Sequence, residues 1–180
     1  MLSSKKEDIP TPRKSASAAV AIIRCLAPCE SFLILRRVDN LEDPWSGHFS
    51  FPGGRKEDKD PDLLTTCIRE TKEETGILLD PDQLQQRLPL EPAGRNLYRP
   101  LWVEPFMFTI PNHPPLTLCR REIQSAYWLN ARVFQNIELH ESVEMLPGHV
   151  FPAFPLEDYY LWGFTYRLLR AILLTDGKQK

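Results

Sequence analysis

The segment from residue 53 to residue 77 constrains this chain more than any other part of its sequence. It opens with two glycines, continues through a charged stretch, and ends in the run RETKEETG at residues 69–76. Asp62 belongs to the residue types that cap helix N-termini, and Gly76 is the type that most often ends a helix. The segment therefore predicts a loop followed by a helix from about Asp62 to Thr75.

Three glutamates share one face of that predicted helix. Glu70, Glu73 and Glu74 are spaced i, i+3 and i+4, so their side chains lie about one turn apart. Like charges at this spacing repel, and a divalent cation between them would relieve the repulsion. Carboxylate oxygens suit Mg²⁺ or Mn²⁺. A solvated acidic helix face is the alternative that these three residues leave open.

The residues before the helix favour a ligand site. A short strand candidate leads into Pro52, Gly53 and Gly54. Consecutive glycines let the backbone turn sharply and approach a ligand closely. A loop carbonyl together with the helix carboxylates would form a cage for a metal ion and phosphate oxygens.

Apolar and β-branched runs on both sides of this segment predict a small β-sheet. The expected strands are residues 18–25, 31–37, 103–110 and 126–130. Three other segments complete the expected outline: a turn at residues 111–115, a proline-interrupted linker at 149–155 and an amphipathic helix at 157–174. This mixture indicates an α+β protein.

Charge and hydropathy exclude several classes of partner. Lysine and arginine number 22 against 24 acidic residues, a net charge of −2, so neither a nucleic-acid polymer nor an anionic membrane is an expected partner. No apolar run is long enough to span a bilayer, and the first residues lack the apolar core of a signal peptide. We expect a cytoplasmic protein with a flexible tail at residues 1–16 and one domain at residues 17–177.

Residues 53–77 resemble the Nudix box, a loop–helix motif of the form Gly-x5-Glu-x7-Arg-Glu-hydrophobic-x-Glu-Glu-x-Gly-hydrophobic. Its second half is intact in this chain. Three positions depart from the pattern: Asp60 stands in place of the first Glu, one extra residue precedes Arg69, and Thr71 replaces an apolar residue. The first two departures affect the loop and the start of the helix, and they leave the metal-binding face of the motif untouched.

The resemblance covers roughly residues 17–175. The sequence EIQSAYWLN at residues 122–130 looks like a later strand of the family, and YYLWGFTYRLLRAIL at 159–173 looks like the helix of its coenzyme A diphosphatase branch. The resemblance implies an α/β/α sandwich in which a mixed β-sheet lies between helices.

The resemblance also implies an activity. Nudix enzymes cleave a diphosphate linked to another moiety, with water attacking phosphorus. Carried over by position, Glu70, Glu73, Glu74 and the carbonyl of Gly54 would coordinate Mg²⁺ or Mn²⁺. Arg69 would hold the carboxylates in place by charge-assisted hydrogen bonds. The resemblance thus makes all five residues part of a catalytic site.

Two glutamates compete for the role of general base. Glu70 is the first candidate, and Glu122, which precedes a strand that resembles the metal-proximal strand of the family, is the second. A solvated charge beside two arginines is the alternative for Glu122. The residues expected to contact substrate are Arg37, Arg55, Phe51 and Trp45.

The substrate class stays open. The coenzyme A branch carries an upstream basic pattern, of which this chain keeps Arg37 and Gly47 but has Val38 and Asp43 where Ser and a second Arg are expected. Coenzyme A or an acyl derivative is therefore one candidate. Nucleoside triphosphates, ADP-ribose, NADH and dinucleoside polyphosphates are others.

Two readings without catalysis also stay open: a module that senses a nucleotide without cleaving it, and an α+β interaction domain. The expected partner is a small molecule with a nucleoside diphosphate linkage. Family members are often dimers, so the resemblance allows a homodimer.

Overall fold

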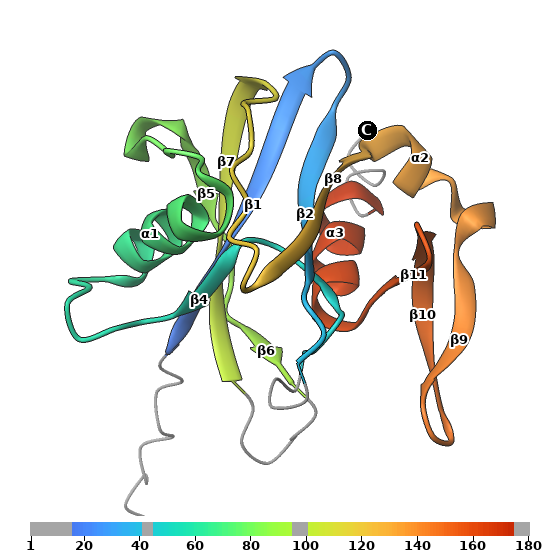
Figure 1. Ribbon diagram of the computed structural model, residues 1–180. Coiled ribbons are helices and arrows are strands. Elements are labelled where there is room, and N and C mark those ends of the chain that lie inside the picture. The colour runs from blue at the N-terminus through green and yellow to red at the C-terminus, as the bar shows by residue number, and fades with distance from the viewer. Residues whose placement is uncertain (1–15, 41–44, 95–100, 175–180) are drawn as a thin grey trace, which may run out of the picture.

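The computed structural model describes residues 16–40, 45–94 and 101–174. Most of the expected N-terminal tail, Asp43 and the last six residues lie outside this part of the chain. A large mixed sheet forms the centre of the described structure, with helices on both of its faces (Figure 1).

The large sheet has the strand order β3-β2-β1-β7-β5, with β4 added beside β1, β6 beside β7 and β8 beside β2. Its strands are β1 (Ala18–Ala27), β2 (Ser31–Arg37), β3 (Phe49–Ser50), β4 (Gly53–Arg55), β5 (Leu84–Arg87), β6 (Glu91–Ala93), β7 (Leu101–Asn112) and β8 (Ile123–Asn130). The pair β1–β7 is parallel and the other pairs are antiparallel, so the expected mixed sheet is confirmed.

Two apolar layers hold the helices to the sheet. Helix α1 (Leu63–Thr75) covers one face, where Cys67 packs with residues such as Ile23 of β1 and Phe108 of β7. Helices α2 (Ala131–Gln135) and α3 (Gly163–Leu174) cover the other face. The predicted α/β/α sandwich of the α+β class is therefore confirmed. Within the described residues, no helix is long and apolar enough to cross a membrane.

A second, smaller sheet stands beside α3 (Figure 1). It has the order β11-β10-β9, built from β9 (Glu141–Leu146), β10 (His149–Leu156) and β11 (Tyr159–Trp162). Two one-turn 3₁₀ helices complete the described elements, η1 (Pro81–Gln83) before β5 and η2 (Ile137–Leu139) before β9.

The second sheet corrects the sequence-based outline of the C-terminal region. The linker predicted at residues 149–155 is strand β10. Pro152 lies where β10 pairs only with β9, and Pro155 where it pairs only with β11. Each proline therefore has one unpaired side for its missing N–H, which is how a strand tolerates proline.

Two other boundaries were also wrong. The helix predicted from residue 157 begins at Gly163, because Tyr159–Trp162 pair with β10 instead. The turn predicted at residues 111–115 starts later than expected, since β7 continues to Asn112. The four strand predictions and the helix at 62–75 are confirmed, with β1, β7 and β8 longer than expected.

Candidate functional site

Helix α1 begins and ends where the sequence predicts. The Asp62 side chain accepts a hydrogen bond from the backbone N–H of Thr65 at 2.7 Å, and Gly76 ends the helix with a φ of 76°. The hydroxyl of Thr71, which replaces an apolar residue of the motif, donates to the carbonyl of Cys67 at 2.8 Å. This bond satisfies the buried hydroxyl within the helix, so the polar residue can occupy a core-facing position.

Asp60 anchors Arg69 in front of the helix. The Arg69 Nε and Nη2 atoms donate to the two carboxylate oxygens of Asp60 at 3.0 and 2.8 Å. Asp60 also accepts bonds from the Glu57 N–H and the Thr66 hydroxyl. These donors, Arg69 first, hold the pKa of Asp60 well below its usual range. Asp60 thus makes the ion pair that orients Arg69.

The two glycines bring backbone against the glutamates. Gly53 has a φ of 149°, and a Cβ there would lie 2.2 Å from the carbonyl oxygen of Ala19. A Cβ on Gly54 would lie 2.4 Å from the Glu70 carboxylate. Glu70 therefore lies directly against Gly54, and a Cβ at this position would displace its carboxylate.

Glu74 is a buried carboxylate with few donors. It is 3% exposed. One oxygen accepts a hydrogen bond from the Gly53 N–H at 2.9 Å, and the other lies 3.9 Å from Nη1 of Arg37. Burial raises the pKa of Glu74 to about 8, and the nearby charges of Glu70 and Glu122 add to this effect. When it is ionised, the Glu74 carboxylate carries more negative charge than the Gly53 N–H and Arg37 offset.

Glu70 and Glu73 precede Glu74 in helix α1, one turn before it and directly before it. Nη1 of Arg69 lies 3.1 Å from Glu70 and 2.9 Å from Glu73. Partial burial is the main cause that raises the pKa of Glu70, and the charges of Glu73 and Glu122 contribute. The charge of Glu122, in the turn before β8, contributes to the raised pKa of both Glu70 and Glu74. The part of Glu122 in a catalytic site stays a prediction.

The donor set fits a hard divalent cation in type. Every side chain in it is a carboxylate, the ligand that Mg²⁺ and Mn²⁺ prefer. Among the described residues, no three acidic, histidine or cysteine side chains already surround a common point. Glu70 and Glu73 instead lie against Arg69. The excess negative charge around Glu74 is what a cation would offset.

The four residues expected to contact substrate lie in different surroundings. Arg37 lies beside Glu74, and Arg55 is exposed on β4. Trp45 is partly exposed in the turn before β3. Phe51 is 2% exposed and packs in the core on the far side of the sheet, so its ring has little surface left for a ligand.

Sequence reasoning missed two contributors to this site. The first is the Gly53 N–H that donates to Glu74, for which the glycine pair was the available signal. The second is Asp60 as the anchor of Arg69. Its position in the motif was the signal, although the shorter side chain and the extra residue obscured it.

Comparisons with known proteins agree with this arrangement. A model of the NUDIX domain matches residues 16–147. An uncharacterized protein of Schizosaccharomyces pombe is 33% identical over 102 residues, which cover 53% of this chain and 30% of that protein. An uncharacterized Nudix hydrolase, NudL, of Yersinia pestis (strain Pestoides F) is 26% identical over 161 residues, covering 86% of this chain and 77% of NudL.

Among solved structures, the MutT protein of Methanosarcina mazei Go1 has a similar fold. Its TM-score is 0.58 at 19% sequence identity, and the match covers 94% of this chain and 100% of that one.

Proposed function

The chain belongs to the NUDIX domain family, and from that membership we propose that it hydrolyses the diphosphate bond of a nucleoside diphosphate derivative. Water attacks phosphorus in this reaction, and a divalent cation, Mg²⁺ or Mn²⁺, is required. The observation that carries the proposal is the convergence of Glu70 and Glu74 with the two glycines before the helix.

The cation would be held by Glu70, Glu73, Glu74 and the carbonyl of Gly54. When bound, it neutralises negative charge on the diphosphate oxygens and so favours attack by water. The excess charge around Glu74 supports this role, because burial costs a carboxylate its hydration and the nearby donors only partly replace it.

Arg69 positions two of these carboxylates. Its guanidinium is fixed by Asp60 on one side and contacts Glu70 and Glu73 on the other. A planar guanidinium held by a bidentate pair loses little further freedom when it binds a second carboxylate. The role of Arg69 is therefore to set where the glutamates lie.

Glu70 is our first candidate for the base that takes the proton from the attacking water. Its carboxylate lies against Gly54, and its raised pKa makes it a better proton acceptor than an ordinary glutamate. Glu122 is the second candidate. It is exposed and close enough for its charge to act on Glu70.

Coenzyme A or an acyl derivative is the substrate that we test first. Residues WGFT at 162–165 and Arg37 with its glycine-containing loop support it, and the missing second arginine speaks against it. Nucleoside triphosphates, ADP-ribose, NADH and dinucleoside polyphosphates form the remaining panel. We further propose that residues 17–177 act as one catalytic domain.

The experiment is a cleavage assay with Mg²⁺ or Mn²⁺ and this panel, with the products separated by chromatography. Cleavage of coenzyme A to 3′,5′-ADP and phosphopantetheine would support that substrate. Cleavage of another member would keep the enzyme and replace the substrate.

Two substitutions serve as controls for this assay. Glu74→Gln should lower turnover by about 10²–10³-fold, while Glu91→Gln, at a glutamate of β6 that lies 3.9 Å from Arg167 of α3, should leave it unchanged. If no panel member is cleaved although nucleotides bind, the chain is a sensing module and the proposed activity is wrong.

A further inference from the structure

Two consecutive arginines at the end of β2 point to opposite faces of the large sheet. Side chains alternate along a strand, so Arg36 and Arg37 leave the backbone in opposite directions. Arg37 lies beside Glu74 on the α1 face. Arg36 lies on the other face, among aromatic rings that pack toward α3 and the second sheet.

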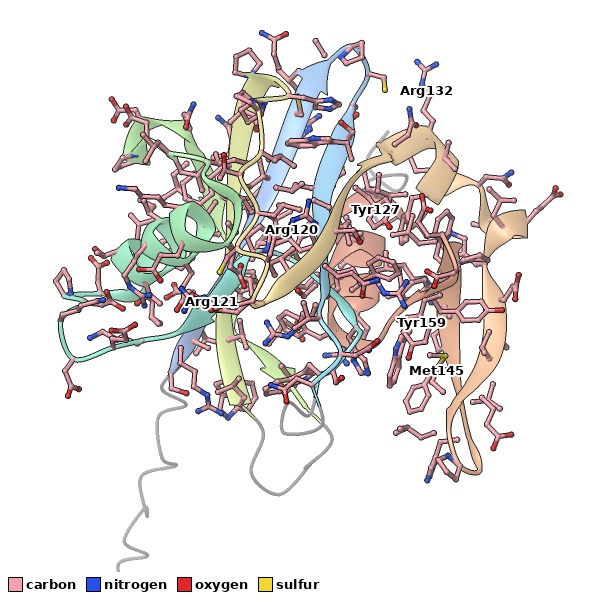
Figure 2. The ribbon with its side chains drawn as sticks, viewed as in Figure 1. Arg120, Arg121, Tyr127, Arg132, Met145 and Tyr159 are labelled. Carbon is pink, nitrogen blue, oxygen red and sulfur yellow. The ribbon has the colours of Figure 1, made fainter. Side chains whose placement is uncertain are left out.

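Arg36 occupies an aromatic setting in which its charge is not fully satisfied. Its side chain is 11% exposed, and its guanidinium carbon lies 5.5 Å from the ring centre of Phe49 and 5.3 Å from that of Tyr159. Figure 2 shows Tyr159 and Tyr127 on the side of the large sheet that faces α3. The buried Nε of Arg36 has no hydrogen-bond partner among the described residues.

A second unsatisfied polar atom lies next to it. Ser125 of β8 pairs directly with Arg36 of β2, which places the two side chains on the same face. Within the described part of the chain, the buried Ser125 hydroxyl also has no partner. Two such groups side by side are unusual, because buried polar groups in folded proteins are nearly always paired.

An exposed acid pairs with one terminal nitrogen of Arg36. Nη1 donates to the carboxylate of Asp158, whose side chain is 75% exposed. Asp158 lies in the two-residue turn between β10 and β11, after Glu157, which has a φ of 54°. That conformation is unfavourable for a residue with a Cβ. The turn therefore presents a carboxylate to Arg36 from an energetically unfavourable conformation.

We propose that Arg36 binds an anionic group of the substrate, such as a phosphate outside the cleaved diphosphate, and that Asp158 occupies this position in the free protein. The proposal rests on the hydrolase function proposed above. Asp158 contacts Nη1 of Arg36, so the anionic group would take over that donor, with the unpaired Arg36 Nε and Ser125 hydroxyl buried beside it. The rings of Phe49 and Tyr159 lie beside it, where a planar base could stack.

Arg36 lies close to the end of its strand. β2 ends at Arg37, one residue after Arg36, and the chain then leaves the sheet as a loop. The proposal requires a substrate that passes this strand end, with its diphosphate near Glu74 and a second anionic group at Arg36. A molecule with two separated anionic groups therefore fits better than a simple nucleoside diphosphate.

The alternative is that Asp158 only pins the second sheet to the large sheet. The two roles predict opposite effects of removing its charge. If Asp158 competes with substrate, Asp158→Asn should lower KM, by about threefold because an exposed ion pair is weak. If it only pins the turn, the same change should leave KM unchanged or raise it.

The test is steady-state kinetics on the panel substrate that the protein cleaves best. Arg36→Gln should raise KM about tenfold or more, as expected for loss of a charged hydrogen bond, with kcat within about threefold. Matched controls are Arg132→Gln, on α2 and labelled in Figure 2, and Asp82→Asn on η1; both residues are exposed and should leave KM unchanged. Melting curves establish that each variant is folded.

Metal-free calorimetry with 3′,5′-ADP, which carries two separated phosphates, and with inorganic pyrophosphate separates this proposal from the hydrolase proposal. Cleavage by the wild type with KM unchanged in Arg36→Gln, or raised in Asp158→Asn, overturns the role of Arg36 alone. Absence of cleavage, with 3′,5′-ADP bound more weakly by Arg36→Gln and more tightly by Asp158→Asn, supports the anion site and overturns the hydrolase. Failure to bind or cleave any of these ligands overturns both.

Discussion

Two buried carboxylates at opposite ends of the α1 segment have opposite electrostatic surroundings. Asp60 and Glu74 are each 3% exposed. Asp60 accepts two bonds from Arg69 and further bonds from a backbone amide and a hydroxyl, and its pKa is lowered. Glu74 accepts one amide bond and has Arg37 at 3.9 Å, and burial raises its pKa to about 8.

The difference teaches that burial alone does not define the role of a charged group. The pKa of a buried carboxylate depends on whether its donors replace the water that it has lost. The donors around Asp60 do so, which suits a residue that fixes Arg69. Those around Glu74 do not, which suits a residue that awaits a cation. The predictions below test this division of roles.

The largest expected effect is on catalysis. Glu74→Gln should lower the cleavage rate of the best panel substrate by about 10²–10³-fold, the loss typical when a group that stabilises charge in the transition state is removed. Relative to the wild type, the melting temperature should hold at about pH 4 and rise above it, because folding then makes Glu74 take up a proton or, above about pH 8, bury a poorly compensated charge. Initial rates and melting curves measure both. A rate within tenfold of the wild type would remove Glu74 from the site.

Asp60→Asn should lower the melting temperature strongly and the cleavage rate only moderately, the reverse of Glu74→Gln. The Asp60 substitution removes the buried charged partner of Arg69, whose side chain is 13% exposed, and leaves Glu57, Glu70 and Glu73 as its acidic neighbours. Loss of one member of a buried pair should lower the melting temperature by about 10 °C. The cleavage rate should fall by only about tenfold, since the effect reaches the site through Arg69. A variant that melts with the wild type would show that Asp60 does not stabilise the fold, and Asp82→Asn is the matched control.

The effect of metal on the melting temperature should also distinguish Asp60 from Glu74. Mn²⁺ at about 100 times its dissociation constant should raise the melting temperature of the wild type by about 5–10 °C. Asp60→Asn should keep most of this shift and Glu74→Gln should lose it. Differential scanning fluorimetry with and without EDTA measures the shift. An equal shift in both variants would place the cation away from Glu74.

Local sequence signals predicted the parts of the site that depend on neighbours in the chain. Asp62 and Gly76 gave the ends of α1 because capping is a local interaction. The spacing of Glu70, Glu73 and Glu74 predicted that they share one helix face, because helix periodicity is also a local property. The strands at 18–25 and 31–37 followed from their apolar composition.

Local sequence patterns did not predict the contacts between segments that are far apart in the chain. Pro152 and Pro155 argued against a strand, yet β10 forms because each faces an unpaired side of the second sheet. Phe51 had the composition of a stacking residue, and only the packing of the far face buries it. The contact of Arg36 with Asp158 joins residues 122 positions apart, beyond the reach of any local pattern.

The smallest expected effect is the change in melting temperature per pH unit in the absence of metal. Between about pH 4.3 and pH 8, folded Glu74 keeps a proton that the unfolded chain releases, so a rise in pH destabilises the fold. Asp60 acts in the opposite sense: its contribution is present above about pH 4 and is lost as pH falls below it. With EDTA present, the melting temperature should therefore fall by about 3 °C per pH unit from pH 5 to pH 8. Asp60→Asn should keep this slope and Glu74→Gln should abolish it; a slope that survives in Glu74→Gln would assign the raised pKa to another group.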